Sequence, residues 1–347
     1  MHTIKHLIKP SLLLLFCSYS SLSTAANISP NDDSIFYTGR VSADHRFAWT
    51  GSGFNLGVNQ GSVAASFTVN KESAITVLVD DVETVHVLKK GTHTYNLTKD
   101  LPQGQHSISV FKRSEAQKGT IKFNGLTIDD DANVFALAQP EKKFMAIGDS
   151  ITCGYGNEAK TIKEGNTIAN QNGYMSYAAI TARELNAQLM ITCWSGRGLY
   201  RNRHLKNDRD GVMPELFNYV LPVEQEENWQ PASYVPDWIL INLGTNDLAH
   251  ADKKGALSKD NYLSAYKKFS DKLIKLYPNA KLIFAIGPMK NAPINQWLTE
   301  FSQNYQQASF VEFAPFASED EKGGHFHPSV LKDKKMANTL VEHILKH

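Results

Sequence analysis

One serine lies where an α/β fold would place a nucleophile. The apolar run 144–147 has the length of a buried strand, and Gly148, Asp149 and Ser150 follow it directly. In a parallel sheet, ligands bind beyond the carboxyl ends of the strands. A serine hydroxyl attacks an acyl group only when a base takes its proton and donors stabilise the resulting anion. A catalytic Ser150 would therefore need both a base and an oxyanion site from elsewhere in the chain.

Two later loops offer the donors. Asn246 follows an apolar run within segment 244–247, and its side chain carries an NH2 group. Segment 194–198 follows another strand-like run, where the backbone N–H of a glycine can point into the same space. These two loops therefore predict an oxyanion site beside Ser150.

His327 is the predicted base. It lies between the last strand-like run and the final helical pattern, directly before Pro328, which we expect to open that helix. This position brings His327 to the same edge of the sheet as Ser150. His325 is the rival candidate, but it precedes Phe326 and would face elsewhere in an extended loop.

The elements that must position these residues are expected after residue 137. There the short alternating strand patterns give way to strand-like runs separated by helical patterns. Five strand-like runs are expected at 144–147, 189–193, 238–243, 282–286 and 310–313. Helical patterns lie between and after them, at 177–186, 215–220, 262–277, 294–305 and 330–345. Strands that alternate with helices predict an α/β domain over 138–347, with a doubly wound, parallel, five-stranded sheet.

The region before it is β throughout. Short alternating strands separated by glycine- and proline-containing turns predict an antiparallel, jelly-roll-like β-sandwich over 27–137. Nothing in this region clusters a nucleophile with a base. Trp49 and Phe54 are open to two interpretations, a platform that stacks on a sugar or, as we favour, part of the core.

Residues 1–26 have the features of a secretory signal peptide. Lys5 and Lys9 precede the apolar run 12–16, and small residues provide a cleavage site near Ala25 or Ala26. The run is too short to span a bilayer, so we expect no membrane anchor and a secreted or periplasmic protein.

The composition excludes several partner classes. The formal net charge is +1, and the sequence has no basic patch with interleaved aromatic residues, so nothing in it predicts nucleic-acid binding. Cys153 and Cys193 are the cysteines that remain after the signal peptide, and their spacing does not suggest a zinc site. Whether they form a disulfide is left open. We expect no metal, no cofactor and a monomer.

Four segments of this chain resemble the four conserved blocks of the SGNH/GDSL hydrolases: 148–150, the glycine-containing 194–198, 244–247 and the pair 327–328. The resemblance covers roughly residues 142–347. The longer strings 147–156 and 195–202 are similar to carbohydrate esterase family 2, whose members join an N-terminal β-sandwich to an SGNH domain. This resemblance implies Ser150 as nucleophile and His327 as base. It also implies an oxyanion hole formed by the backbone N–H groups of Ser150 and Gly196, with Gly198 as a weaker choice than Gly196, and by the side chain of Asn246. It also implies a serine esterase that removes O-acetyl groups from plant cell-wall polysaccharides such as xylan and glucomannan, with a preference for sugar 6-hydroxyls.

One position departs from the SGNH pattern. These hydrolases usually carry an aspartate three residues before the base, where this chain has Gly324, and His325 follows it. Asp320 or Glu321 could serve only if the loop folds inward. Because some family 2 esterases hold the histidine with a backbone carbonyl, the resemblance predicts a Ser–His dyad.

The substrate contacts and the function have alternatives. Residues that could flank a sugar are Trp297, Tyr155, Tyr200, Arg201 and Asn202. The competing functions are an SGNH lipase or thioesterase of other specificity, and a carbohydrate-binding protein with a weakly active hydrolase domain.

Overall fold

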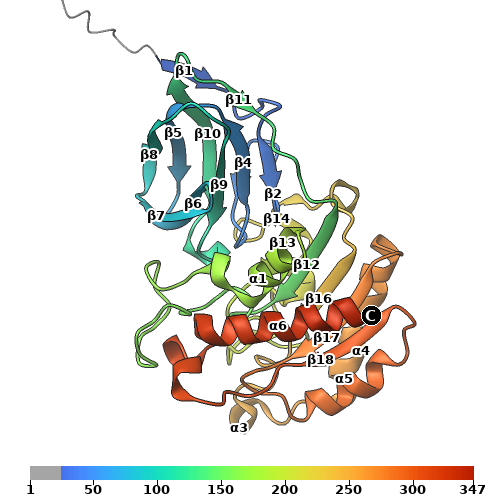
Figure 1. Cartoon of the computed structure of the whole chain (residues 1–347). Helices are drawn as coiled ribbons and strands as arrows, with labels where there is room; N and C mark the ends of the chain where they lie inside the picture. Colours follow the sequence, from blue (N-terminus) through green and yellow to red (C-terminus); the bar gives the residue numbers. More distant parts are fainter. Residues whose placement is uncertain (1–24) are drawn as a thin grey trace, which may run out of the picture.

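The computed structural model describes residues 25–347, and its two parts, a β-sandwich and an α/β unit, lie one above the other in Figure 1. Most of the predicted signal peptide lies outside the described residues. Its last two residues, Ala25 and Ala26, begin strand β1, which pairs antiparallel with the strand that contains Asp129.

The sandwich contains two antiparallel sheets. The first has the order β1–β10–β5–β8 with β3 beside β10, and its strands are β1 (Ala25–Ile28), β3 (Arg46–Phe47), β5 (Gly61–Val69), β8 (Gly91–Leu101) and β10 (Ile121–Asp129). The second has the order β11–β4–β9–β6–β7 with β2 beside β4, and its strands are β2 (Phe36–Thr38), β4 (Gly53–Val58), β6 (Ser73–Val79), β7 (Val82–Leu88), β9 (His106–Lys112) and β11 (Val134–Phe135).

Aromatic residues from both sheets fill the sandwich core. Phe54 stacks on Phe123 with ring centroids 4.2 Å apart, and Phe67 packs beside them. Phe54 and Trp49 are fully buried, so both are core residues and neither offers a platform to a sugar. The Trp49 ring packs into the core of the α/β unit, where its Nε1 donates to the backbone oxygen of Tyr219 at 3.2 Å.

The predicted parallel sheet is confirmed. Its strands follow the order β13–β12–β16–β17–β18, and they are β12 (Lys142–Gly148), β13 (Ala187–Cys193), β16 (Trp238–Asn242), β17 (Lys281–Ile286) and β18 (Ala308–Glu312). This doubly wound order reverses direction at β12, between β13 and β16. The loop after β12 therefore lies at the switch point, where such sheets bind ligands.

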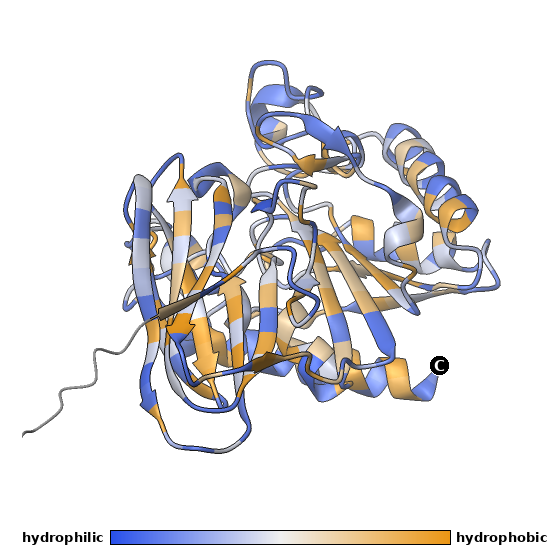
Figure 2. Cartoon of the chain, turned by 90° about the horizontal axis from the view of Figure 1, so that it is seen from above, coloured by the Kyte–Doolittle hydropathy of each residue, from blue (hydrophilic) through white to orange (hydrophobic). Residues whose placement is uncertain are grey.

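Helices cover both faces of this sheet. The helices of the unit are α1 (Tyr177–Glu184), α2 (Met213–Leu216), α3 (Ala251–Lys254), α4 (Lys259–Leu276), α5 (Ile294–Ser302) and α6 (Val330–Lys346). Met145 and Ile147 pack with α4 and α5, whereas Phe144 and Ala146 pack with α1 and α6. In Figure 2 apolar residues recur along the strands and on one side of the helices, as this two-sided burial requires.

Two expected helix positions need correction. The segment predicted as a helix over 215–220 ends as α2 at Leu216, and the chain then forms β14 (Tyr219–Leu221), which pairs with β15 (Glu226–Asn228). Pro328 does not open the last helix. That helix begins at Val330 and is capped by Ser329, whose Oγ accepts from the backbone N–H of Lys332.

Among residues 25–347, no helix combines the length and apolar character needed to cross a bilayer.

Candidate active site

Ser150 and His327 meet as the sequence analysis predicted. Ser150 follows β12 and is buried, with 6% of its surface exposed, and its Oγ lies 2.8 Å from His327 Nε2. The two residues are 177 positions apart in the chain. They come together because the loop after β12 and the loop before α6 lie at the same edge of the parallel sheet.

The loop after β12 is tightly folded. Asp149 Oδ1 accepts from the backbone N–H of Ile151 at 2.9 Å, and the Asp149 carbonyl accepts from Cys153 N–H at 3.1 Å. Gly148 is required by close packing, because an added Cβ would lie 2.0 Å from Thr152 Oγ1. This loop presents Ser150 to the pocket in one defined position.

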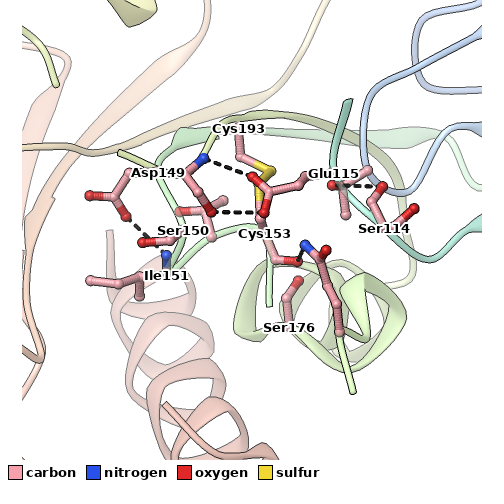
Figure 3. The surroundings of a disulfide bond; sticks show 12 residues. Ser114, Glu115, Asp149, Ser150, Ile151, Cys153, Ser176 and Cys193 are labelled. Carbon is pink, nitrogen blue, oxygen red and sulfur yellow. Dashed lines mark hydrogen bonds between the residues drawn. A yellow bond between two sulfur atoms is a disulfide. The ribbon is translucent and has the colours of Figure 1, made fainter. Parts of the chain in front are cut away.

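A disulfide joins this loop to the neighbouring strand. Cys153 bonds to Cys193, the last residue of β13, as Figure 3 shows. The pairing that the sequence left open therefore exists, and it ties the Ser150 loop to the start of the segment that contains Gly196.

Backbone carbonyls, not a carboxylate, face the other nitrogen of the His327 ring. His327 Nδ1 lies 3.2 Å from the carbonyl oxygens of both Gly324 and His325. Asp320 bonds to Ser318, and the buried Glu321 pairs with Lys332 and Lys335. In the described part of the chain, no carboxylate is hydrogen-bonded to His327.

An aromatic stack also holds the histidine. The Tyr155 ring lies 4.0 Å from the His327 ring at an interplanar angle of 26°, and its hydroxyl is 3.0 Å from His325 Nδ1. Burial lowers the pKa of His327 from 6.5 to about 4, although the carbonyls of His325 and Gly324 act in the opposite direction. The neutral ring that a general base requires is therefore favoured.

The residues expected to supply the oxyanion donors, Ser150, Gly196 and Asn246, line one pocket, but their donors differ in whether they already make a hydrogen bond. The backbone N–H groups of Ser150 and Gly196 donate to no other group within residues 25–347. The Gly198 N–H is occupied by Asn202 Oδ1 at 3.1 Å, which favours Gly196 over this alternative. Asn246 also lines the pocket, but its Nδ2 donates to Asp149 Oδ2 and to the carbonyl of Arg197, both at 2.9 Å.

Both aspartates beside these residues have structural contacts. The Asp247 carboxylate accepts three backbone N–H bonds, from Leu199, Tyr200 and Arg201, at 2.7–2.9 Å. Burial raises the pKa of Asp149 to about 7 and that of Asp247 to about 6. Neither carboxylate bonds to the His327 ring.

Comparison with known proteins identifies the family. Residues 37–137 match the model of the carbohydrate esterase 2 N-terminal domain, and residues 146–331 match that of the GDSL-like lipase/acylhydrolase family. A solved family two carbohydrate esterase from Clostridium thermocellum, in complex with cellohexaose, is 30% identical with a TM-score of 0.84. The match covers 90% of this chain and 98% of that one. The chain belongs to carbohydrate esterase family 2.

Two curated relatives have names that include an activity. The cellulase/esterase CelE of Acetivibrio thermocellus is 31% identical over 334 residues, which cover 91% of this chain but only 40% of that relative. An acetylxylan esterase / glucomannan deacetylase of Cellvibrio japonicus is 27% identical, with 92% of this chain and 91% of the relative covered. The family assignment makes this chain a carboxylic ester hydrolase.

In this family 2 esterase, Ser150 opens into a pocket of about 470 Å³. The pocket is lined by Ser150, Tyr155, Ser195, Gly196, Arg203, Thr245, Asn246, Met289, His325, Phe326 and His327. Sequence reasoning did not propose Arg203, Met289 or Phe326. Phe326 is 52% exposed, and its place directly before the predicted base was the one signal that could have found it.

Only Tyr155 of the five expected sugar contacts lines this pocket. Arg201 and Asn202 are buried and bond to Asp247 O and Asp210 O respectively, and Tyr200 lies against Arg209. Trp297 packs over Tyr262, with ring centroids 6.0 Å apart. His325 also lines the pocket, contrary to the expectation that it faces elsewhere, but it bonds to Tyr155 and not to Ser150.

Among the described residues, no cluster of three or more histidine, cysteine, aspartate or glutamate side chains could hold a metal ion.

Proposed function

We propose that this chain is a serine esterase that removes acetyl groups from plant cell-wall polysaccharides such as xylan and glucomannan. The observation that carries the proposal is the 2.8 Å contact between Ser150 Oγ and His327 Nε2 at the floor of an open pocket. The Cellvibrio japonicus relative, which is named for both substrates, supports the choice of polysaccharide.

The proposed reaction has two steps. His327 Nε2 takes the proton of Ser150 as Oγ attacks the acetyl carbonyl, and it then gives that proton to the departing sugar oxygen. A water molecule, activated by the same nitrogen, releases acetate from the acyl-enzyme. The backbone N–H groups of Ser150 and Gly196, together with the side-chain amide of Asn246, donate hydrogen bonds to the oxyanion of each tetrahedral intermediate and so stabilise it.

We propose that Ser150 and His327 act as a dyad. The carbonyls of Gly324 and His325 accept a hydrogen bond from Nδ1–H, which leaves Nε2 as the acceptor toward Ser150. The stack on Tyr155 fixes the tilt of the ring. A carbonyl supplies less stabilisation to the imidazolium than a carboxylate, so the orienting role dominates.

Acetyl groups on sugar 6-hydroxyls are the proposed preferred esters. Ser150 is recessed, with 6% of its surface exposed, whereas Phe326 is exposed at the pocket and can pack on an apolar sugar face. An ester at a 6-hydroxyl stands one methylene away from the ring, so it reaches a recessed serine with less crowding than a ring ester does.

We also propose that the protein is exported, with a signal peptide over 1–26, a sandwich over 27–137 and a catalytic domain over 138–347. The charged and apolar pattern of residues 5–16 supports export, and the Cys153–Cys193 disulfide suits an oxidising compartment.

An acyl-chain and glycan panel tests the function. We expect acetate release from acetylated glucomannan and xylan, a higher kcat/KM for 6-O-acetyl than for 2- or 3-O-acetyl glucosides, and falling rates from acetyl to longer acyl esters of p-nitrophenol. Preference for long acyl chains would replace the polysaccharide assignment with a lipase-like one. Ser150→Ala is the matched control for background hydrolysis.

The pH profile tests the state of His327. Because the base must be neutral and its pKa is lowered to about 4, kcat/KM should be lost only as pH falls through about 4. At pH 5, an ordinary histidine with a pKa near 6.5 would be only about 3% neutral. We therefore expect near-maximal kcat/KM for p-nitrophenyl acetate at pH 5, with circular dichroism as the control for folding. An acid limb centred near pH 6.5 would contradict this assignment.

A further inference from the structure

A buried carboxylate of the sandwich reaches the catalytic domain. Glu115 follows β9 and lies directly before the short helix Ala116–Lys118 of the sandwich, and it is fully buried. Its Oε2 accepts from the backbone N–H of Ser195 at 2.8 Å, and its Oε1 accepts from Ser195 Oγ, also at 2.8 Å. Figure 3 shows the Glu115 side chain beside the Cys153–Cys193 disulfide.

The surroundings keep Glu115 in this position. Asn166 Nδ2 donates to Oε1 at 2.8 Å, which is the third hydrogen bond of the carboxylate, and burial raises the pKa of the carboxyl group. The Nζ of Lys112, also buried, donates to the carbonyls of Ser114 and Glu115 at 2.8 and 2.9 Å, which fixes the backbone that carries the side chain. A carboxylate is costly to bury, and here each oxygen is used to bind a specific donor.

The residue that Glu115 holds is next to an expected oxyanion donor. Ser195 and Gly196 share a peptide bond, so fixing the N–H and Oγ of Ser195 restricts the orientation of the following amide. Gly196 has a φ of +81°, a conformation that glycine adopts at no steric cost. The disulfide at Cys193 anchors the chain two residues before Ser195.

We propose that Glu115 is a positioning residue of the esterase: it clamps Ser195 so that the Gly196 N–H is directed at the acyl oxygen. The sandwich thereby completes the active site of the catalytic domain. This inference rests on the proposed function, because it takes Gly196 as an oxyanion donor.

A second contact of Glu115 leads to the base. Asn166, which donates to Glu115, accepts the N–H of Gly156 through its Oδ1 at 3.2 Å. Gly156 follows Tyr155, whose ring stacks on His327, and its carbonyl accepts from Gly324 N–H at 2.9 Å. Glu115 is therefore also connected, through Asn166 and Gly156, to the two loops that hold His327.

Glu115→Gln and Ser195→Ala test the clamp. Glu115→Gln keeps the shape of the side chain but replaces one carboxylate oxygen by an NH2 group. That group would face a donor that the oxygen now binds. Ser195→Ala removes only the hydroxyl contact. Because the oxyanion forms in the transition state, we expect Glu115→Gln to lower kcat roughly 10- to 100-fold with little change in KM. Ser195→Ala should lower kcat less, and the double variant should match Glu115→Gln alone.

The matched control is another carboxylate between the two parts of the molecule. Glu158 of the catalytic domain pairs with Arg113 of the sandwich and does not contact segment 194–198. Glu158→Gln should leave kcat within about twofold of the parent, because Glu158 makes no hydrogen bond to segment 194–198 and the buried Arg113 keeps its ion pair with Glu83. If it lowers kcat as much as Glu115→Gln, general docking of the domains and not the clamp explains the effect.

Two substrates separate failure of the clamp from failure of the proposed function. Each variant is assayed with p-nitrophenyl acetate, which has no sugar, and with acetylated glucomannan. If the unmodified protein hydrolyses p-nitrophenyl acetate but not acetylated glucomannan, polysaccharide deacetylation is refuted. The clamp would still be judged by kcat on p-nitrophenyl acetate. Unchanged kcat with a lowered Tm in Glu115→Gln, or strictly additive losses in the double variant, would overturn the clamp. If Glu115→Gln does not fold, unchanged kcat in Ser195→Ala overturns it.

Discussion

Ser150→Ala and His327→Ala are each expected to lower kcat/KM for acetyl esters by roughly 10⁴- to 10⁶-fold. Ser150 Oγ is the atom that forms the acyl-enzyme, and His327 Nε2, 2.8 Å away, is the group placed to take its proton. Since each residue is of little use without the other, the double variant should be no slower than either single variant. Steady-state rates of p-nitrophenyl acetate hydrolysis, after subtraction of the uncatalysed rate, measure this.

Two controls make the assignment of the base specific. His325 lies two positions from His327 and lines the same pocket, but it contacts Tyr155, so His325→Ala should cost less than about tenfold in kcat/KM. Asp320→Ala should have a still smaller effect, because Asp320 bonds to Ser318. A loss in Asp320→Ala comparable to that in His327→Ala would replace the dyad by a triad with a distant acid. A comparable loss in His325→Ala would leave the base unassigned.

The parts of the site that the sequence predicted are those set by the sheet. Ser150 and Asn246 each follow a buried apolar run of a parallel sheet, and such runs end at one edge whatever the loops do. His327 follows the last strand and reaches the same edge. Element order and strand period were therefore sufficient to predict that these residues meet.

The substrate contacts depended on how loops fold, which the strand pattern does not determine. Arg201 and Asn202 are turned inward because the Asp247 carboxylate, from a different loop, collects three backbone N–H groups. No local sequence pattern predicts that the Asp247 carboxylate binds the backbone of residues 199–201. Trp297 is different, since it lies three residues after Ile294, a core residue of α5, and helical spacing alone predicts that it packs inward.

Glu115 could not have been found from the sequence. It lies between two strands of a domain with no other catalytic candidate, and nothing in its neighbours indicates that it crosses to Ser195, 80 residues away. Residues 219 and 220, the end of the helix predicted over 215–220, were mistaken for helix for a similar reason, because the strand they form is stabilised by pairing with β15 and by Arg40 Nη1, which donates to the Tyr219 carbonyl at 3.0 Å. Both cases depend on contacts with residues that are distant in the chain or that follow a turn, and a local sequence pattern does not show these contacts.

Asn246→Ala is expected to lower kcat about 10²- to 10³-fold, with a much smaller effect on KM, because the oxyanion it would stabilise exists only in the transition state. Both hydrogens of Asn246 Nδ2 are engaged, one by Asp149 Oδ2 and one by Arg197 O. Donation to the oxyanion must therefore weaken or share one of these bonds. Asn246→Asp should be slower still, because its carboxylate cannot donate when ionised and would repel the developing charge.

A stability control separates catalysis from packing in Asn246→Ala. The substitution leaves the buried Asp149 Oδ2 without the Asn246 donor, so Tm should fall as well. Rates are therefore compared well below the Tm of the variant. Asn96→Ala, the same change at an exposed position of β8, should alter neither kcat nor Tm appreciably. A loss confined to KM would show that Asn246 binds the ground-state ester, and the oxyanion hole would then consist of the Ser150 and Gly196 amides alone.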